Sequence, residues 1–270
     1  MAQVTSADGT HIGYDRLSHD GPAVVLVSGG LDDGTENLPL GSKLADEFAV
    51  VTYRRRGRGD SGDTAPYALE REIDDLAAVI EAAGGRAHLF GASSGGALAL
   101  EAAAAGLPID RIVVHEVLYL TDDEMVAGWR AYRKELDTAL EANDRAEALR
   151  LFMRLAGSSD DEVAGAEAAP VWTTLLALAP TLRYDAACIG DGPPPAERLA
   201  AVIQPVLLTT GASLDPHSRG LPVDFYAAAA DAVAACLPNS RRATAERAGH
   251  VPDPALLGPI VAGFYAELTP

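Results

Sequence analysis

The stretch that decides the fold is Gly91-Ala92-Ser93-Ser94-Gly95, which follows a short apolar run and precedes a helical pattern. This spacing fits G-x-S-x-G, in which a serine lies on a sharp turn between a strand and a helix. Small residues two before and two after Ser93 let the strand and the helix approach without a clash. Ser93 is therefore the candidate nucleophile. Ser94 is a rival, but the two glycines are symmetric about Ser93.

Short apolar runs and helical spacing alternate on both sides of this turn. A hairpin around Asp8-Gly9 opens the chain. The predicted strands cover residues 23–27, 49–53, 87–90 and 111–115, and the predicted helices cover 69–83 and the segment from the turn to Ala105. Strand and helix in alternation predict a parallel sheet with helices on both of its faces.

The alternation stops after Glu116 and resumes near Val206. Residues 121–204 contain helical stretches, such as 125–141 and 146–155, but no convincing strand. An all-helical segment inserted after the sixth strand predicts a lid (cap), so residues 1–120 and 205–270 form the core domain. The core pattern ends with a strand at 206–210, a helix at 225–236, a weak strand at 242–245 and a helix at 254–268.

Composition limits the class of protein. With 270 residues, 48% of them hydrophobic and 22% charged, the chain can bury one substantial core with a modest insertion. A net charge of −18 argues against nucleic acid, which binds clustered cations. The first residues lack a signal peptide and no apolar run could span a bilayer, so we expect a cytoplasmic protein without membrane contact. The two cysteines, Cys188 and Cys236, predict neither a disulfide framework nor a metal site.

Two further motifs accompany the serine turn in chain order. Residues 53–61, Tyr-Arg-Arg-Arg-Gly-Arg-Gly-Asp-Ser, are similar to the segment D-x-R-G-x-G-x-S, and Gly249-His250 precedes the last predicted helix. With these motifs, nearly the whole chain resembles the α/β-hydrolase superfamily, and in particular its haloperoxidase-like and esterase branch, as in small actinobacterial serine hydrolases. Arg54 stands where that family usually has Asp. The resemblance implies an α/β fold with a mostly parallel eight-stranded sheet flanked by helices.

A serine hydroxyl needs a neighbouring imidazole to accept its proton. Of the six histidines, His250 lies in a loop after the last predicted strand, in the order serine, acid, histidine that the resembled fold uses. His115 ends a strand, and His217 follows the seventh strand, where an acid is expected. His250 is therefore the candidate base.

The acid of the triad has several candidates. The resemblance implies a loop after the seventh strand, and there Asp215 is the first choice, although the spacing from Gly211 is one residue longer than the usual pattern. Asp215 could instead be a turn or cap residue. Glu116, at the end of the sixth strand, is the main alternative, and Asp224 is a further one.

Backbone N–H groups near Ser93 would bind a developing oxyanion. Ser94 N is one donor. The loop after the third strand, Ser28-Gly29-Gly30, lacks the histidine of the family's His-Gly-x, and Gly30 is the predicted second donor, with Leu31 next. The arginines at 54–56 and 58 predict a brace that binds carboxylates and carbonyls around the turn. The weaker alternative is a docking site for an acidic substrate or a phosphopantetheine arm.

The predicted reaction is hydrolysis of a carboxylic ester or thioester through an acyl-Ser93 intermediate, with no cofactor and no metal. The lid carries large apolar side chains, most of which we expect to pack it onto the core while a minority favour a small apolar or aromatic acyl group: Trp129, Tyr132, Phe152, Met153, Trp172, Leu175 and Leu176. Alternatives are an acyltransferase, lactonase or cyclase, a cofactor-free perhydrolase, and a non-catalytic ligand-binding protein. The expected partner is a small-molecule substrate, and the expected state is a monomer or homodimer.

Overall fold

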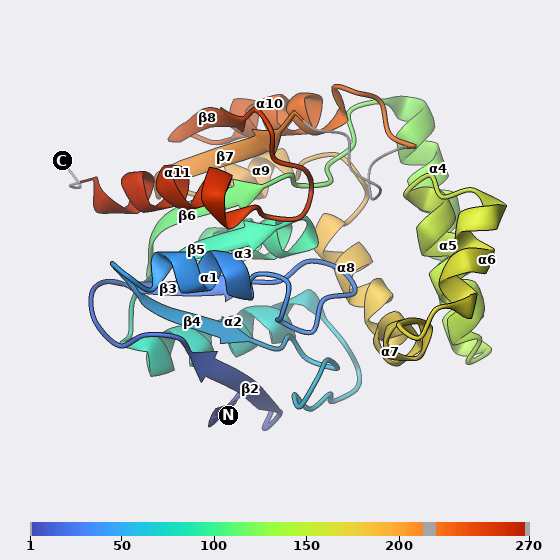
Figure 1. Ribbon diagram of the computed structural model, residues 1–270, viewed down its shortest axis with the longest axis horizontal. Coiled ribbons are helices and arrows are strands. Elements are labelled where there is room, and N and C mark those ends of the chain that lie inside the picture. Colours follow the sequence, from blue (N-terminus) through green and yellow to red (C-terminus); the bar gives the residue numbers. More distant parts are fainter. Residues whose placement is uncertain (1, 213–219, 268–270) are drawn as a thin grey trace.

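The computed structural model describes residues 2–212 and 220–267, and its centre is one eight-stranded sheet (Figure 1). The strand order is β1-β2-β4-β3-β5-β6-β7-β8. β1 and β2 pair in antiparallel fashion, as does β2 with β4, and all later pairs are parallel. The strands are β1 (Ala2–Thr5), β2 (His11–Arg16), β3 (Ala23–Val27), β4 (Ala49–Tyr53), β5 (Ala87–Ala92), β6 (Ile109–His115), β7 (Val206–Gly211) and β8 (Ser240–Ala245). The mostly parallel eight-stranded sheet is the predicted one.

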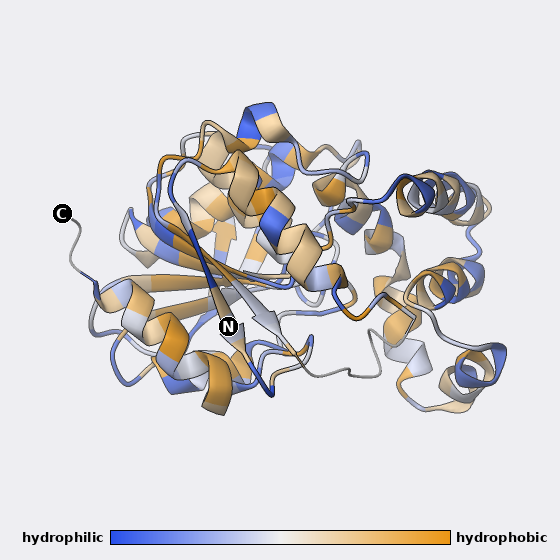
Figure 2. Ribbon diagram, turned by 90° about the horizontal axis from the view of Figure 1, so that it is seen from above, coloured by the Kyte–Doolittle hydropathy of each residue, from blue (hydrophilic) through white to orange (hydrophobic). Residues whose placement is uncertain are grey.

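Helices cover both faces of the sheet because each central strand is apolar on both sides. In β3, Val24 and Leu26 belong to the core under one face, and Val25 and Val27 belong to the core under the other. α1 (Leu38–Leu44) and α11 (Pro254–Ala266) cover the first face. α2 (Leu69–Ala83), α3 (Ser94–Ala104) and α10 (Phe225–Cys236) cover the second. Figure 2 shows the hydrophobic residues concentrated in the strands and on the helix sides that face them.

Between β6 and β7 the described chain consists of helices joined by loops, with no strand. The insertion comprises α4 (Asp123–Glu141), α5 (Arg145–Leu155), α6 (Asp160–Ala168), α7 (Trp172–Leu178), a 3₁₀ turn (Ala179–Thr181), α8 (Leu182–Ile189) and α9 (Ala196–Leu199). α4, α5 and α6 stand beside the core, while α8 returns to pack on α3 (Figure 1). The boundaries of this insertion as a lid domain stay a prediction. Throughout the described ranges, no helix has the length and apolar character needed to cross a membrane.

Candidate functional site

Ser93 lies on a strained turn between β5 and α3. Its φ of 55° and ψ of −127° fall in a region that residues with side chains rarely adopt. The Ser93 N–H donates to the His115 carbonyl at 2.9 Å, which ties the turn to β6. A Cβ at Gly91 would lie 2.5 Å from the carbonyl oxygen of Gly95, and a Cβ at Gly95 would collide with the Val27 carbonyl. Gly91 therefore permits the close approach of β5 and α3, as the sequence predicts, and Gly95 permits that of α3 and the end of β3.

The loop after β3 lies against this turn. A Cβ at Gly29 would be 3.2 Å from Ser93 Cβ. The Gly29 carbonyl accepts a hydrogen bond from Arg58. Since the C=O and N–H of a trans peptide point in opposite directions, this bond turns the N–H of Gly30 away from Arg58. The orientation of the predicted donor Gly30 is thus fixed by the loop, and Leu31, the second candidate, has a left-handed φ of 55°.

The arginines of 54–58 are all buried and all paired. The prediction that they brace the loops around the turn is confirmed, because Arg55 also donates to the Ser28 carbonyl and Arg58 to that of Asp32. Guanidinium groups that are buried and engaged in this way are not available to dock an acidic substrate. Their carboxylate partners are Asp15 and Asp60 for Arg54, Glu72 and Asp185 for Arg55, Asp8 and Asp75 for Arg56, and Asp185 for Arg58.

Asp185, on α8, joins the insertion to the serine turn. Its Oδ1 accepts hydrogen bonds from Arg55, Arg58 and the Ser94 hydroxyl, each at 2.7 Å. Burial acts to raise the pKa of Asp185, but the guanidinium groups of Arg58 and Arg55 hold it below its usual value. The hydroxyl of Ser94, the rival nucleophile, is therefore committed to a structural bond. Its N–H stands at the beginning of α3, where helix N–H groups have no intrahelical partner.

His250 follows β8 and lies against the carboxylate of Glu116. His250 Nδ1 is 2.9 Å from Glu116 Oε2, and Glu116 Oε1 accepts the Gly211 N–H at 2.8 Å. Glu116 directly follows β6 with a left-handed φ of 48° and is buried, whereas the side chain of His250 is 18% exposed. A carboxylate only accepts, so Nδ1 carries the ring proton and Nε2 is the basic nitrogen.

The other acid candidates are placed differently. Asp215, the first choice from the sequence, lies outside the described residues, as does His217. Asp224 directly precedes α10. Glu116, the alternative from the sequence, is the candidate that the described residues bring into contact with His250.

Two neighbours of His250 were not singled out from the sequence. The ring of Tyr226, on α10, stacks on the imidazole with centroids 5.1 Å apart and planes at 17°. The His115 side chain reaches the same loop, because its Nε2 lies 3.0 Å from the Gly249 carbonyl. Neither pattern is readable along the chain, because both contacts depend on the spatial order of β6, β7 and β8.

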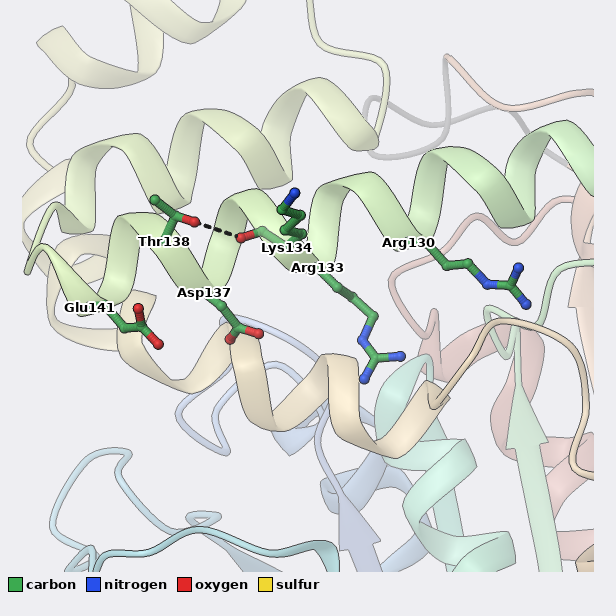
Figure 3. A pocket seen from close by; sticks show the side chains of 6 residues that line it. All are labelled: Arg130, Arg133, Lys134, Asp137, Thr138 and Glu141. Atoms are coloured by element: carbon green, nitrogen blue, oxygen red, sulfur yellow. Dashed lines mark hydrogen bonds between the residues drawn. The ribbon is translucent and has the colours of Figure 1, made fainter.

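Two surface clefts lie elsewhere, and neither is lined by Ser93 or His250. The first, of about 400 Å³, lies on α4. Figure 3 shows the Arg133 side chain extending from this helix, and Arg133 donates to the Gly190 carbonyl at 2.8 Å. The first is lined by Arg130, Arg133, Lys134, Asp137, Thr138 and Glu141. The second, of about 470 Å³, is lined by Ala65, Pro66, Tyr67, Asp137, Glu141, Arg183 and Tyr184. Both are shallow features of the insertion and its border with the core.

Solved structures of similar proteins share this architecture. An alpha/beta hydrolase from Sphaerobacter thermophilus DSM 20745 is 41% identical, with a TM-score of 0.85 over 98% of this chain and 100% of the other. The esterase RhEst1 from Rhodococcus sp. ECU1013 is 23% identical, with a TM-score of 0.72 over 99% of both chains, a likeness of fold alone.

Sequence comparison gives the same family. YraK of Bacillus subtilis (strain 168), described as an uncharacterized hydrolase, is 28% identical over 159 residues, which are 54% of this chain and 55% of YraK. The chain thus spans about half the length of this curated relative, and it spans 35% of an AB hydrolase superfamily protein of Gibberella zeae. The profile of the Alpha/beta hydrolase family matches residues 24–257, which include the serine turn, Glu116 and His250. The chain belongs to the alpha/beta hydrolase family.

Proposed function

We propose that this hydrolase cleaves a carboxylic ester or thioester through an acyl-Ser93 intermediate, with His250 as the base and Glu116 as the acid. The observation that carries the proposal is the 2.9 Å bond between His250 Nδ1 and Glu116 Oε2, in a chain whose strained turn presents Ser93. A carboxylate at Nδ1 selects the tautomer whose Nε2 can take the serine proton, and it stabilises the imidazolium that forms.

The reaction runs in two steps. Ser93 Oγ attacks the carbonyl carbon while His250 Nε2 accepts the hydroxyl proton, and His250 then returns that proton to the leaving alcohol or thiol. In the second step water attacks the acyl carbon while the same imidazole removes its proton, and the imidazolium then passes that proton to Ser93 Oγ as the acyl–Ser93 bond breaks and the carboxylic acid leaves. The N–H groups of Gly30 and Ser94 would stabilise the oxyanion in both steps. Support for Gly30 comes from Arg58, whose bond to the Gly29 carbonyl orients that peptide.

The proposed substrate class rests on the apolar and aromatic side chains of the insertion. Trp129 and Tyr132 on α4 are buried, their rings 5.5 Å apart, and Phe152 and Trp172 are half-buried. Trp129 Nε1 donates to the Gly190 carbonyl at 2.9 Å, so this ring is fixed rather than adaptable. We infer that an insertion rich in such rings favours a small apolar or aromatic acyl group, taken as a free small molecule by a monomer or homodimer.

A fluorophosphonate probe tests the proposal directly, since it reacts with an activated serine. We expect stoichiometric labelling of the wild type and none of Ser93→Ala, with labelling of His250→Ala slowed by at least about 10³-fold. A folded wild type that does not label would contradict the proposal and would favour a ligand-binding role. With labelling established, a p-nitrophenyl ester series of increasing chain length, with and without peroxide, separates hydrolysis from perhydrolysis.

A further inference from the structure

The loop that carries His250 is held at three consecutive residues. The Ala248 carbonyl packs so closely over Gly211 that a Cβ there would collide with it. The Gly249 carbonyl lies 3.0 Å from His115 Nε2, and His250 Nδ1 lies 2.9 Å from Glu116 Oε2. The position of the base therefore depends on β6 and β7, and two of its three supports come from the adjacent residues 115 and 116.

His115 also holds the nucleophile. It pairs with Ala92 across the β5–β6 ladder, and its carbonyl accepts the Ser93 N–H at 2.9 Å. Its main chain thus supports the serine turn, while its side chain supports the base loop.

One nitrogen of the His115 ring has a clear role. A carbonyl only accepts, so Nε2 carries a proton toward Gly249, while Nδ1 lies 3.1 Å from Thr209 Oγ1, a hydroxyl that also donates to the Val114 carbonyl. Burial lowers the pKa of His115, which favours the neutral imidazole. The side chain is 0% exposed, so it does not touch a substrate. Its role must be exerted through Gly249 and Ser93.

On the basis of the proposed function, we propose that His115 is a positioning residue that sets the distance between base and nucleophile through its Nε2–H bond to the Gly249 carbonyl. A displacement of about 1 Å between catalytic groups can lower a rate about 10²-fold. Loss of this one bond should therefore act on kcat, while ground-state binding of the substrate, and hence KM, stays nearly unchanged.

Two amide substitutions at position 115 distinguish the effect of the hydrogen bond to Gly249 from the effect of the size of the ring. The amide nitrogen of glutamine reaches the place of Nε2, whereas that of asparagine reaches only the place of Nδ1. We expect His115→Gln to retain kcat within about threefold and His115→Asn to lose about 30-fold, with KM within about twofold in both. The fluorophosphonate probe titrates the active sites of each preparation, so that kcat is counted per competent molecule and misfolded protein does not enter.

His88 provides a matched control. It lies on the neighbouring strand β5, is buried, and stacks on Tyr265 with centroids 4.6 Å apart, away from the base loop. His88→Asn should lower the melting temperature but leave kcat per titrated site unchanged.

Should His115→Asn not fold, Thr209→Val keeps the side-chain shape but removes the hydroxyl beside Nδ1, together with its bond to the Val114 carbonyl, and should lower kcat about threefold at constant KM. If every folded variant at positions 115 and 209 labels normally and has the wild-type kcat, the inference about His115 is overturned while the proposed function stands. A wild type that does not label would overturn the proposed function as well.

Discussion

Two buried carboxylates flank the serine turn, and their surroundings differ. Asp185 Oδ1 takes two guanidinium groups and the Ser94 hydroxyl. Glu116 takes a backbone N–H on one oxygen and the His250 imidazole on the other, and among the described ion pairs it has no guanidinium partner. Both lie next to the same turn, yet one is neutralised by permanent cations and the other faces a group that can gain and lose a proton.

The difference suits Asp185 to a structural role and, under the proposed function, Glu116 to a catalytic one. Arginine stays protonated throughout a reaction, so its carboxylate partner contributes a constant field and a fixed geometry. A carboxylate beside an imidazole interacts more strongly when the imidazolium forms, and this differential interaction is what lowers a barrier. Asp185 thus holds α8 of the insertion on the core, whereas Glu116 is suited to assist His250.

The largest effect, on kcat, is expected from replacing Glu116. Glu116→Gln removes the charge and can present an N–H to Nδ1, which favours the wrong tautomer, so kcat should fall by about 10³- to 10⁴-fold at nearly constant melting temperature. Steady-state kinetics on a p-nitrophenyl ester would measure this.

Asp215→Asn is the matched variant, because Asp215 is the other acid candidate. With Glu116 as the acid, kcat of Asp215→Asn should stay within about threefold of the wild type. The reverse outcome, in which Asp215→Asn loses the activity and Glu116→Gln keeps it, would assign the acid to Asp215.

A smaller effect, on the free energy of unfolding, is expected from replacing Asp185. Asp185→Asn leaves Arg58 without its carboxylate and should lower the free energy of unfolding by about 3 kcal/mol. Urea unfolding followed by circular dichroism measures this. Activity per titrated site should fall less than about tenfold, because no reacting group is lost. A loss of activity as large as that of Glu116→Gln would contradict the distinction between the two carboxylates.

The smallest expected effect is the loss of stability of the folded protein at acidic pH. Burial acts to raise the pKa of both Asp185 and Glu72. Arg58 and Arg55 nevertheless hold the pKa of Asp185 below its usual value, and Arg55 holds the pKa of Glu72 below its usual value. The unfolded chain therefore binds protons at a pH where the folded chain does not. The stabilisation is complete above the unfolded pKa of about 4 and is lost as the pH falls toward the folded values.

The melting temperature should accordingly fall between about pH 5 and pH 3, and the fall should be shallower in Asp185→Asn. Calorimetry at a series of pH values would measure both. Parallel curves for the wild type and Asp185→Asn would show that this carboxylate does not carry the acid sensitivity.

Local sequence signals predicted most of the fold. β3 and β4 have the predicted bounds, because β-branched runs that are apolar on both faces have few alternatives to a central strand. The helix at 38–44 was not anticipated, since Pro39 and Gly41 give its sequence a weak helical preference. Its formation depends on tertiary packing, in which Leu40 and Leu44 are buried in the same core as residues of α11.

The site was predictable in part. The strained turn at Ser93 is encoded locally, because only glycines at 91 and 95 permit the close approaches there. The choice between Glu116 and Asp215 could not be made along the chain, because residues 116 and 250 meet only through the order of β6, β7 and β8 and through a left-handed φ at Glu116. The contacts of Tyr226 and His115 have the same origin.

The positive φ angles of Ser93 and Glu116 also matter for practical work on this protein. Backbone conformations of this kind cost about 1 kcal/mol or more in residues with a side chain, and glycine removes that cost. Under the proposed function Ser93→Gly is inactive, and this chain should tolerate heat and storage at least as well as the wild type. That makes it a convenient form for soaking an uncleaved ester into crystals, in which the acyl-binding surface could be seen occupied.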